Sequence, residues 1–191
     1  MIKYIFILLI GFLLPVTTGC TDTNLTHDIP LVPRPAHLVP GSGNYLFSDK
    51  TVFVVENEEQ AAVAASLISR FTNAAGFTPK LVVGATEKGD VRFVTDASLK
   101  SEAYSLEVSP EEIIVKASGD KGFFYALQTI RQLLPASIER ESLSDKKEKW
   151  SIPAMNVQDE PRFEYRALLL DASRFLFLKR TFCVSLTVCR C

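Results

Sequence analysis

Apolar and polar positions repeat with two different periods along the middle of the chain, and each period predicts a different element. Residues 51–55, Thr-Val-Phe-Val-Val, are β-branched or aromatic, which is typical of a strand. Asn57 then offers a helix N-cap, and two glutamates follow it where the helix dipole favours negative charge. Helically spaced apolar residues continue this helix until Gly76 ends it: Ala64, Ile68, Phe71 and Ala75.

The second half of the pattern predicts further strands and one more helix. Short apolar runs at 80–83 and 91–94 indicate strands, and residues 104–108 and 112–116 indicate a hairpin around Ser109-Pro110. A second helix is expected over 120–134, since Phe123, Leu127, Ile130 and Leu134 share one stripe and Pro135 follows. Upstream, residues 41–44 (Gly-Ser-Gly-Asn) indicate a turn. Residues 31–159 therefore predict one α+β domain, a sandwich-like arrangement of a sheet with two packed helices.

The N-terminal 20 residues have the pattern of a bacterial lipoprotein signal. Lys3 supplies a positive start, and an apolar run over 4–16 is too short to span a bilayer as a helix. Small residues precede Cys20, which predicts that this cysteine is lipidated and that 21–30 form a tether. The chain is therefore expected to be exported and lipid-anchored on the outer-membrane or periplasmic side of a bacterial membrane. The alternative is ordinary secretion with a chance cysteine.

Composition and charge exclude several function classes. The chain is 47% hydrophobic and 23% charged with a formal net charge of −1, which gives no reason to expect nucleic acid or an anionic membrane surface as a partner. His27 and His37 are interpreted as loop residues, and neither belongs to a metal-ligand pattern. Residues 119–122 (Gly-Asp-Lys-Gly) lack the spacing of a nucleotide-binding loop and indicate a turn and cap. No metal or organic cofactor is expected.

Adjacent carboxylates occur at 58–59 and 111–112, where a helix start and a hairpin turn are expected. Both pairs are interpreted as solvated charge rather than as catalysts. The aromatic cluster at 123–125 is interpreted as core rather than as a sugar platform. Residues 165–170 form an apolar run that predicts a doubly buried strand of a parallel sheet, closed by Asp171. Arg166 inside this run is costly unless it is paired or faces a polar pocket.

Three segments together resemble the β-N-acetylhexosaminidases, which are glycoside hydrolases. Residues 161–174 read P-R-F-E-Y-R-A-L-L-L-D-A-S-R and resemble the first strand of the family's (β/α)₈ barrel. Residues 122–135 resemble the second helix of the small domain that precedes this barrel, and residues 32–35 (V-P-R-P) resemble that domain's opening. Ala167, Phe175 and Leu178 depart from the family's usual Gly, His and Pro.

The resemblance implies a specific chemistry and a specific division of labour. Such enzymes retain configuration by substrate assistance, in which the 2-acetamido oxygen attacks the anomeric carbon, a Glu serves as acid and base, and the adjacent Asp orients the acetamido group. That Asp-Glu pair belongs to a later barrel strand, so no catalytic residue is assigned here. Arg166 would bind hydroxyls of the sugar ring, whereas Asp171 and Arg174 look like scaffold. The small domain carries no catalytic residue and packs against the barrel.

Length argues that this chain holds only a fragment of such an enzyme. A (β/α)₈ barrel takes about 250 residues, but only 27 residues run from Tyr165 to Cys191. Residues 160–191 are therefore expected to be the truncated start of a barrel, and the chain to be an inactive fragment. The rival hypothesis is a surface-anchored, non-catalytic binding or interaction module formed by 31–159.

Three of the four cysteines, Cys183, Cys189 and Cys191, crowd the C-terminal end. A disulfide or a soft-metal site would explain them. We favour a frameshifted tail from about residue 179, because codons for 179–191 can be chosen to give, in a shifted frame, an apolar string that resembles the family's next helix.

Overall fold

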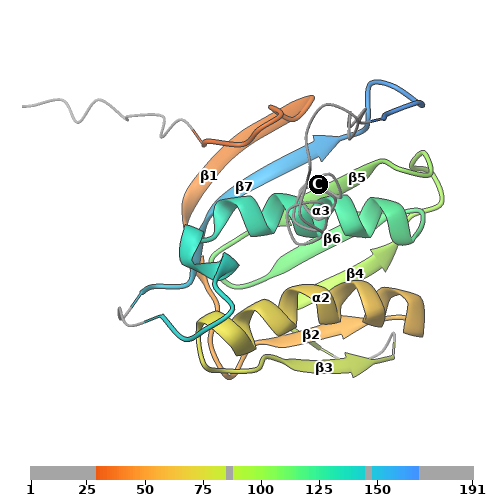
Figure 1. Cartoon of the computed structure of the whole chain (residues 1–191). Helices are drawn as coiled ribbons and strands as arrows, with labels where there is room; N and C mark the ends of the chain where they lie inside the picture. The colour runs from red at the N-terminus through yellow and green to blue at the C-terminus, as the bar shows by residue number, and fades with distance from the viewer. Residues whose placement is uncertain (1–28, 85–87, 145–147, 168–191) are drawn as a thin grey trace, which may run out of the picture.

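The computed structural model describes residues 29–84, 88–144 and 148–167, which form a two-layer α/β sandwich (Figure 1). Its elements in chain order are β1 (His37–Leu46), β2 (Val52–Val55), α2 (Glu58–Ala74), β3 (Lys80–Val83), β4 (Val91–Thr95), β5 (Tyr104–Val108), β6 (Ile113–Ala117), α3 (Asp120–Leu133), the 3-10 helix η1 (Ala136–Glu139) and β7 (Ser151–Asp159). Figure 1 shows α2 and α3 side by side over one face of the sheet. The expected α+β sandwich with two packed helices is therefore present.

The seven-stranded sheet is mixed and has the order β1-β7-β5-β6-β4-β2-β3. Strands β3, β2, β4 and β6 run parallel to one another, and α2 connects β2 to β3. The other half is antiparallel, since β5 pairs with β6 and β7, and β1 pairs with β7. The predicted hairpin is thus confirmed as β5–β6.

Both helices begin and end close to the predicted residues. Asn57 caps α2 by accepting a hydrogen bond from the Gln60 backbone N–H at 2.9 Å. Gly76 follows with φ of +76°, a left-handed conformation that suits a glycine after a helix. Gly119 is the N-cap residue of α3, as the turn-and-cap interpretation of residues 119–122 requires.

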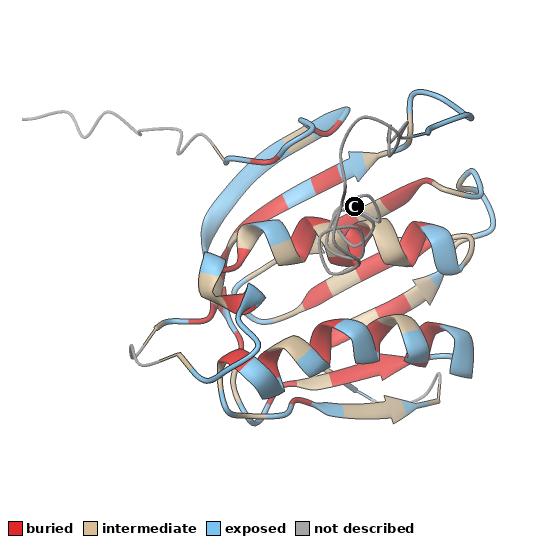
Figure 2. Cartoon of the chain, viewed as in Figure 1, coloured by how far each residue is buried: buried red, intermediate tan, exposed pale blue. Residues whose placement is uncertain are grey.

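The core lies between the sheet and the helices. Figure 2 shows buried positions along the strands and on the helix faces turned toward them. Aromatic pairs join the layers: Phe47 and Phe71 have ring centroids 4.9 Å apart, and Phe93 stacks on Phe123 at 5.0 Å. Such pairs add to the apolar burial that stabilises the fold. Ile29, which was assigned to the tether, packs against this core.

Three sequence predictions differ from the structure. His37 is not in a loop but opens β1, opposite Gln158. Residues 41–44 are not a turn between elements but an irregularity inside β1, where the register shifts between Pro40 and Asn44. Of the predicted strand over 165–170, the structure describes only 165–167, and these residues are not in a strand. The proposed barrel start therefore remains a prediction.

Strands β1 and β7 were not predicted at all. Pro153 interrupts the β7 sequence, and a proline normally argues against an inner strand because it cannot donate a ladder hydrogen bond. Here Pro153 pairs with Asn44, next to the register shift in β1. The proline thus lies where the ladder is already irregular.

No helix within the described ranges combines the length and the apolar character that crossing a membrane requires.

Candidate functional site

Arg166 lies in the irregular segment 160–167 that follows β7, beside the start of β5 and the first half of α3. Its Nη2 donates to Glu102 Oε2 at 2.7 Å and to the Tyr125 hydroxyl at 3.0 Å. Its Nη1 donates to the Phe163 carbonyl at 2.8 Å, and its Cζ lies 5.7 Å from the centre of the Tyr125 ring. The predicted sugar-binding arginine is therefore paired on the surface, not buried in a strand.

Glu102 is the anionic centre of this cluster. Its side chain is 25% exposed, and it also pairs with Lys121 Nζ at 3.3 Å. The hydrogen bond from Arg166 is the main cause that holds the pKa of Glu102 below its ordinary 4.5, and Lys121 adds to the effect. In return, Glu102 raises the pKa of Arg166 further above its ordinary value. Both groups are therefore charged at neutral pH.

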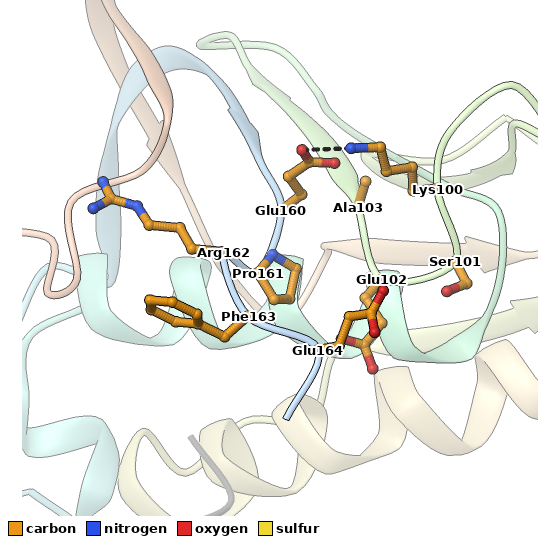
Figure 3. A pocket seen from close by; sticks show the side chains of 9 residues that line it. All are labelled: Lys100, Ser101, Glu102, Ala103, Glu160, Pro161, Arg162, Phe163 and Glu164. Atoms are coloured by element: carbon orange, nitrogen blue, oxygen red, sulfur yellow. Dashed lines mark hydrogen bonds and ion pairs between the residues drawn. The ribbon is translucent and has the colours of Figure 1, made fainter. Parts of the chain in front are cut away.

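A pocket of about 510 Å³ adjoins the cluster (Figure 3). One wall is the loop that leads into β5 and the other is the chain after β7, with lining residues Lys100, Ser101, Glu102, Ala103, Glu160, Pro161, Arg162, Phe163 and Glu164. Lys100 and Glu160 form an ion pair of 2.8 Å between the two walls. Phe163 is 72% exposed.

The pocket is rich in groups that bind hydroxyls or charge, but it does not contain a set of catalytic groups. Its carboxylates are either held by cations, as Glu102 and Glu160 are, or exposed, as Glu164 is. Within the ranges that the structure describes, no group of His, Cys, Asp and Glu is arranged to hold a metal ion. The arrangement can bind and orient a polar ligand.

The other candidate residues stay apart from this site. Glu58 and Glu59 are exposed in the first turn of α2, as expected of solvated charge, and Glu112 pairs with Arg92 at 2.9 Å. Phe123 is core, as expected. Cys20, Asp171, Arg174 and the three C-terminal cysteines lie outside the described residues.

Sequence reasoning missed Glu102 and Tyr125. Glu102 is 64 residues from Arg166 and Tyr125 is 41, so no local spacing connects them. Tyr125 was grouped with the core, yet it is half-buried and its hydroxyl faces the arginine. No signal in a single sequence could have brought these residues together.

Comparisons with known proteins agree on one family. Residues 28–160 match the profile described as glycosyl hydrolase family 20, domain 2. A β-hexosaminidase of Porphyromonas gingivalis is 29% identical over 149 residues, which is 76% of this chain and 19% of the relative. A β-N-acetylhexosaminidase of Cellulomonas fimi is 28% identical over 155 residues, which is 78% of this chain and 30% of the relative.

A solved structure shows the same relationship in three dimensions. The Streptomyces plicatus N-acetyl-β-hexosaminidase in complex with Thio-NAglucal superposes with a TM-score of 0.68 at 28% identity, over 77% of this chain and 29% of that chain. This chain thus spans less than a third of each of these relatives. Because the family profile covers well over half of its residues, the chain belongs to glycosyl hydrolase family 20, and residues 28–160 form the family's domain 2.

Proposed function

We propose that this chain supplies the non-catalytic small domain of a β-N-acetylhexosaminidase that removes terminal β-linked N-acetylhexosamine from glycans. The match of residues 28–160 to domain 2 of the family carries the proposal. The names of the relatives support the substrate class, since both are hexosaminidases. The resemblance of residues 161–174 to the first barrel strand supports a catalytic barrel that would follow this domain.

In the proposed mechanism the sugar's own acetamido oxygen is the nucleophile, and a Glu with an adjacent Asp assists it. No such pair is assigned to the small domain, whose described carboxylates are exposed or engaged in ion pairs and hydrogen bonds. Arg166 is the residue of this chain that contributes to binding, because its fork of donors suits neighbouring ring hydroxyls. The chemistry uses no metal or organic cofactor.

An activity assay tests this division of labour. The chain without residues 1–20 should release no chromophore from an aryl β-N-acetylglucosaminide above the buffer blank. General acid–base catalysis alone contributes about 10²–10⁴ in rate, and no residue in the described part of the chain is assigned to it. Turnover that survives Arg166→Ala would contradict the proposal, because catalysis would then come from the small domain itself.

A surface-anchored binding or interaction module is the second candidate. Its support is that the described residues form a sheet, two helices and a continuous core without needing a barrel. The DNA downstream of this coding sequence separates the two functions. A shifted frame that encodes H-x-x-L-x-D-D-x-x-W-R and an Asp-Glu pair supports the enzyme, and an intergenic region supports the module.

The proposal places the protein outside the cytoplasm, anchored to a bacterial membrane through lipid on Cys20. Its support is the signal pattern that ends at Cys20. When the protein is expressed in bacterial cells with labelled fatty acid, it should incorporate the label, and the Cys20→Ser variant should not. If the mature N-terminus is free and carries no lipid, the anchoring proposal is wrong and the protein is simply secreted.

A further inference from the structure

Residues 29–36, which we call the strap, run over the domain before β1 begins. Ile29 packs against the core and Leu31 is buried, so the strap is fixed to the domain at its start. The Val32 backbone N–H donates to Gln132 Oε1 at 3.1 Å, which places this part of the strap at the C-terminal end of α3. Figure 1 shows the strap on the β1 side of the molecule, away from α2 and β3.

The middle of the strap presents an apolar side chain and a cation to solvent. Val32 is 78% exposed, and Pro33 and Arg34 beside it are exposed as well. Within the described ranges, no carboxylate forms an ion pair with Arg34. An exposed aliphatic side chain next to such a cation suits a bilayer surface, where apolar groups enter the interface and cations meet lipid phosphates. We call residues 32–34 the strap corner.

The number of residues before the strap limits how far the strap can lie from a lipid on Cys20. Eight residues, 21–28, separate Cys20 from Ile29. A fully extended chain over this stretch reaches about 30 Å, which is an upper limit for any conformation. The start of the strap therefore stays within about 30 Å of the bilayer surface in an anchored chain.

The opposite corner of the domain, the first turn of α2, lies beyond this reach. Helix α2 contacts β2 and β3, which are five and six strand spacings of about 4.8 Å from β1, or about 25–29 Å. Helices α2 and α3 follow the parallel strands β2 and β6, so the start of α2 is also about one helix length, about 20 Å, from the end of α3. The diagonal is about 33 Å, and a tether around the surface would need a longer path.

We propose that the strap corner lies against the bilayer surface in the anchored protein, so that the first turn of α2 and the β3 edge face outward. This inference rests on the lipid proposed for Cys20. It assigns the membrane-facing surface of the domain, and it leaves the α2 and β3 side accessible to other molecules.

Two tryptophan positions compare the two corners in the full chain. Trp150 is the only tryptophan of the sequence, so a Trp150→Phe background allows one reporter at a time. Val32→Trp places the reporter at the strap corner, and Glu59→Trp places it in the exposed first turn of α2. In vesicles that contain a dansyl-labelled headgroup lipid, energy transfer from the lipidated chain should be severalfold higher for Val32→Trp. Its emission should also shift to shorter wavelength, because the indole enters a less polar interface.

Cys20→Ser is the control, because it removes the lipid and should abolish energy transfer from both positions. If Trp150→Phe loses cooperative unfolding, the same pair is measured with Trp150 retained, since its signal is common to both variants. Equal transfer from the two positions, or higher transfer from Glu59→Trp, would overturn the inference. If the chain carries no fatty acid, the proposed anchoring fails and the inference fails with it. If it carries lipid but the two positions do not differ, the anchoring stands and only the orientation is wrong.

Discussion

Tyr104 and Thr129 place two hydroxyl groups 2.6 Å apart inside the domain, between β5 and α3. Tyr104 is only 4% exposed, and the Thr129 hydroxyl also donates toward the Tyr125 carbonyl. Burial is the main cause that raises the pKa of Tyr104 to about 12, although the hydrogen bond to Thr129 acts in the opposite direction. The raised pKa of Tyr104 therefore makes the free energy of unfolding depend on pH in the alkaline range.

The free energy of unfolding should fall above about pH 10. The unfolded chain loses the Tyr104 proton near the ordinary pKa of 10.0, whereas the folded chain keeps it until about 12. The contribution is thus complete below pH 10 and lost as the pH rises toward 12, and a shift of this size corresponds to about 2–3 kcal/mol. Urea unfolding of the wild type and Tyr104→Phe at pH 8, 10 and 11 measures it. Equal pH slopes in the two proteins would contradict the assignment to Tyr104.

Single residues of the site were only partly predictable from the sequence. The motif over residues 161–174 identifies Arg166 as a candidate. The cost of removing a guanidinium from water predicts that this arginine has a partner. The partner itself was not predictable, because Glu102 reaches Arg166 through the way β5 and α3 pack. The strand position of His37 was not predictable either, because β1 has few buried residues and its sequence shows no period-two pattern.

At the scale of elements, prediction succeeded where one face of an element is buried and capping is local. Helix α2 begins after the predicted Asn57 cap, and β5 and β6 alternate between buried and half-buried positions. Prediction failed for β1 and β7, which pair with each other along their length. Both strands contain residues that argue against a strand in a sequence: β1 contains glycines and β7 contains Pro153. These residues lie at the irregular part of the ladder between the two strands.

Gly122 offers a test of how α3 is seated on the sheet. Glycine to alanine inside a helix ordinarily stabilises it by up to about 1 kcal/mol. Here Gly122→Ala should destabilise the domain by about 1–3 kcal/mol, because the new methyl group meets the Ala103 carbonyl oxygen at 2.4 Å. Urea denaturation measures the change.

Gly119→Ser is the matched control for this prediction. Gly119 lies before the same helix, has an extended backbone, and has no atom within 4 Å of a built Cβ. A serine there offers an N-cap side chain and should change stability by only a few tenths of a kcal/mol. If Gly122→Ala is as stable as the wild type, α3 can move away from β5 at little cost, and the close approach at Gly122 does not fix the position of α3.

At the scale of the whole molecule, composition and pattern predicted one α+β domain, and the mixed sheet with two helices agrees. The inner position of β7 explains why the domain needs the chain as far as Asp159. This strand lies between β1 and β5, and the Asp159 carboxylate accepts a hydrogen bond from the Ala36 backbone N–H at 3.0 Å. From Arg162 to Ala167 every residue is exposed. Among the described residues, the domain core therefore ends with β7.

A chain of residues 28–160 should consequently fold as well as residues 28–191. It keeps every strand of the sheet and the Lys100–Glu160 pair, and loses the surface pair between Glu102 and Arg166. An exposed pair contributes up to about 1 kcal/mol, so the Tm should change by no more than about 4 °C. Light scattering on heating should decrease, because removal of 161–191 deletes exposed Phe163 and Tyr165 together with a later apolar run. Loss of cooperative unfolding in the shorter chain would instead mean that residues after Glu160 complete the core.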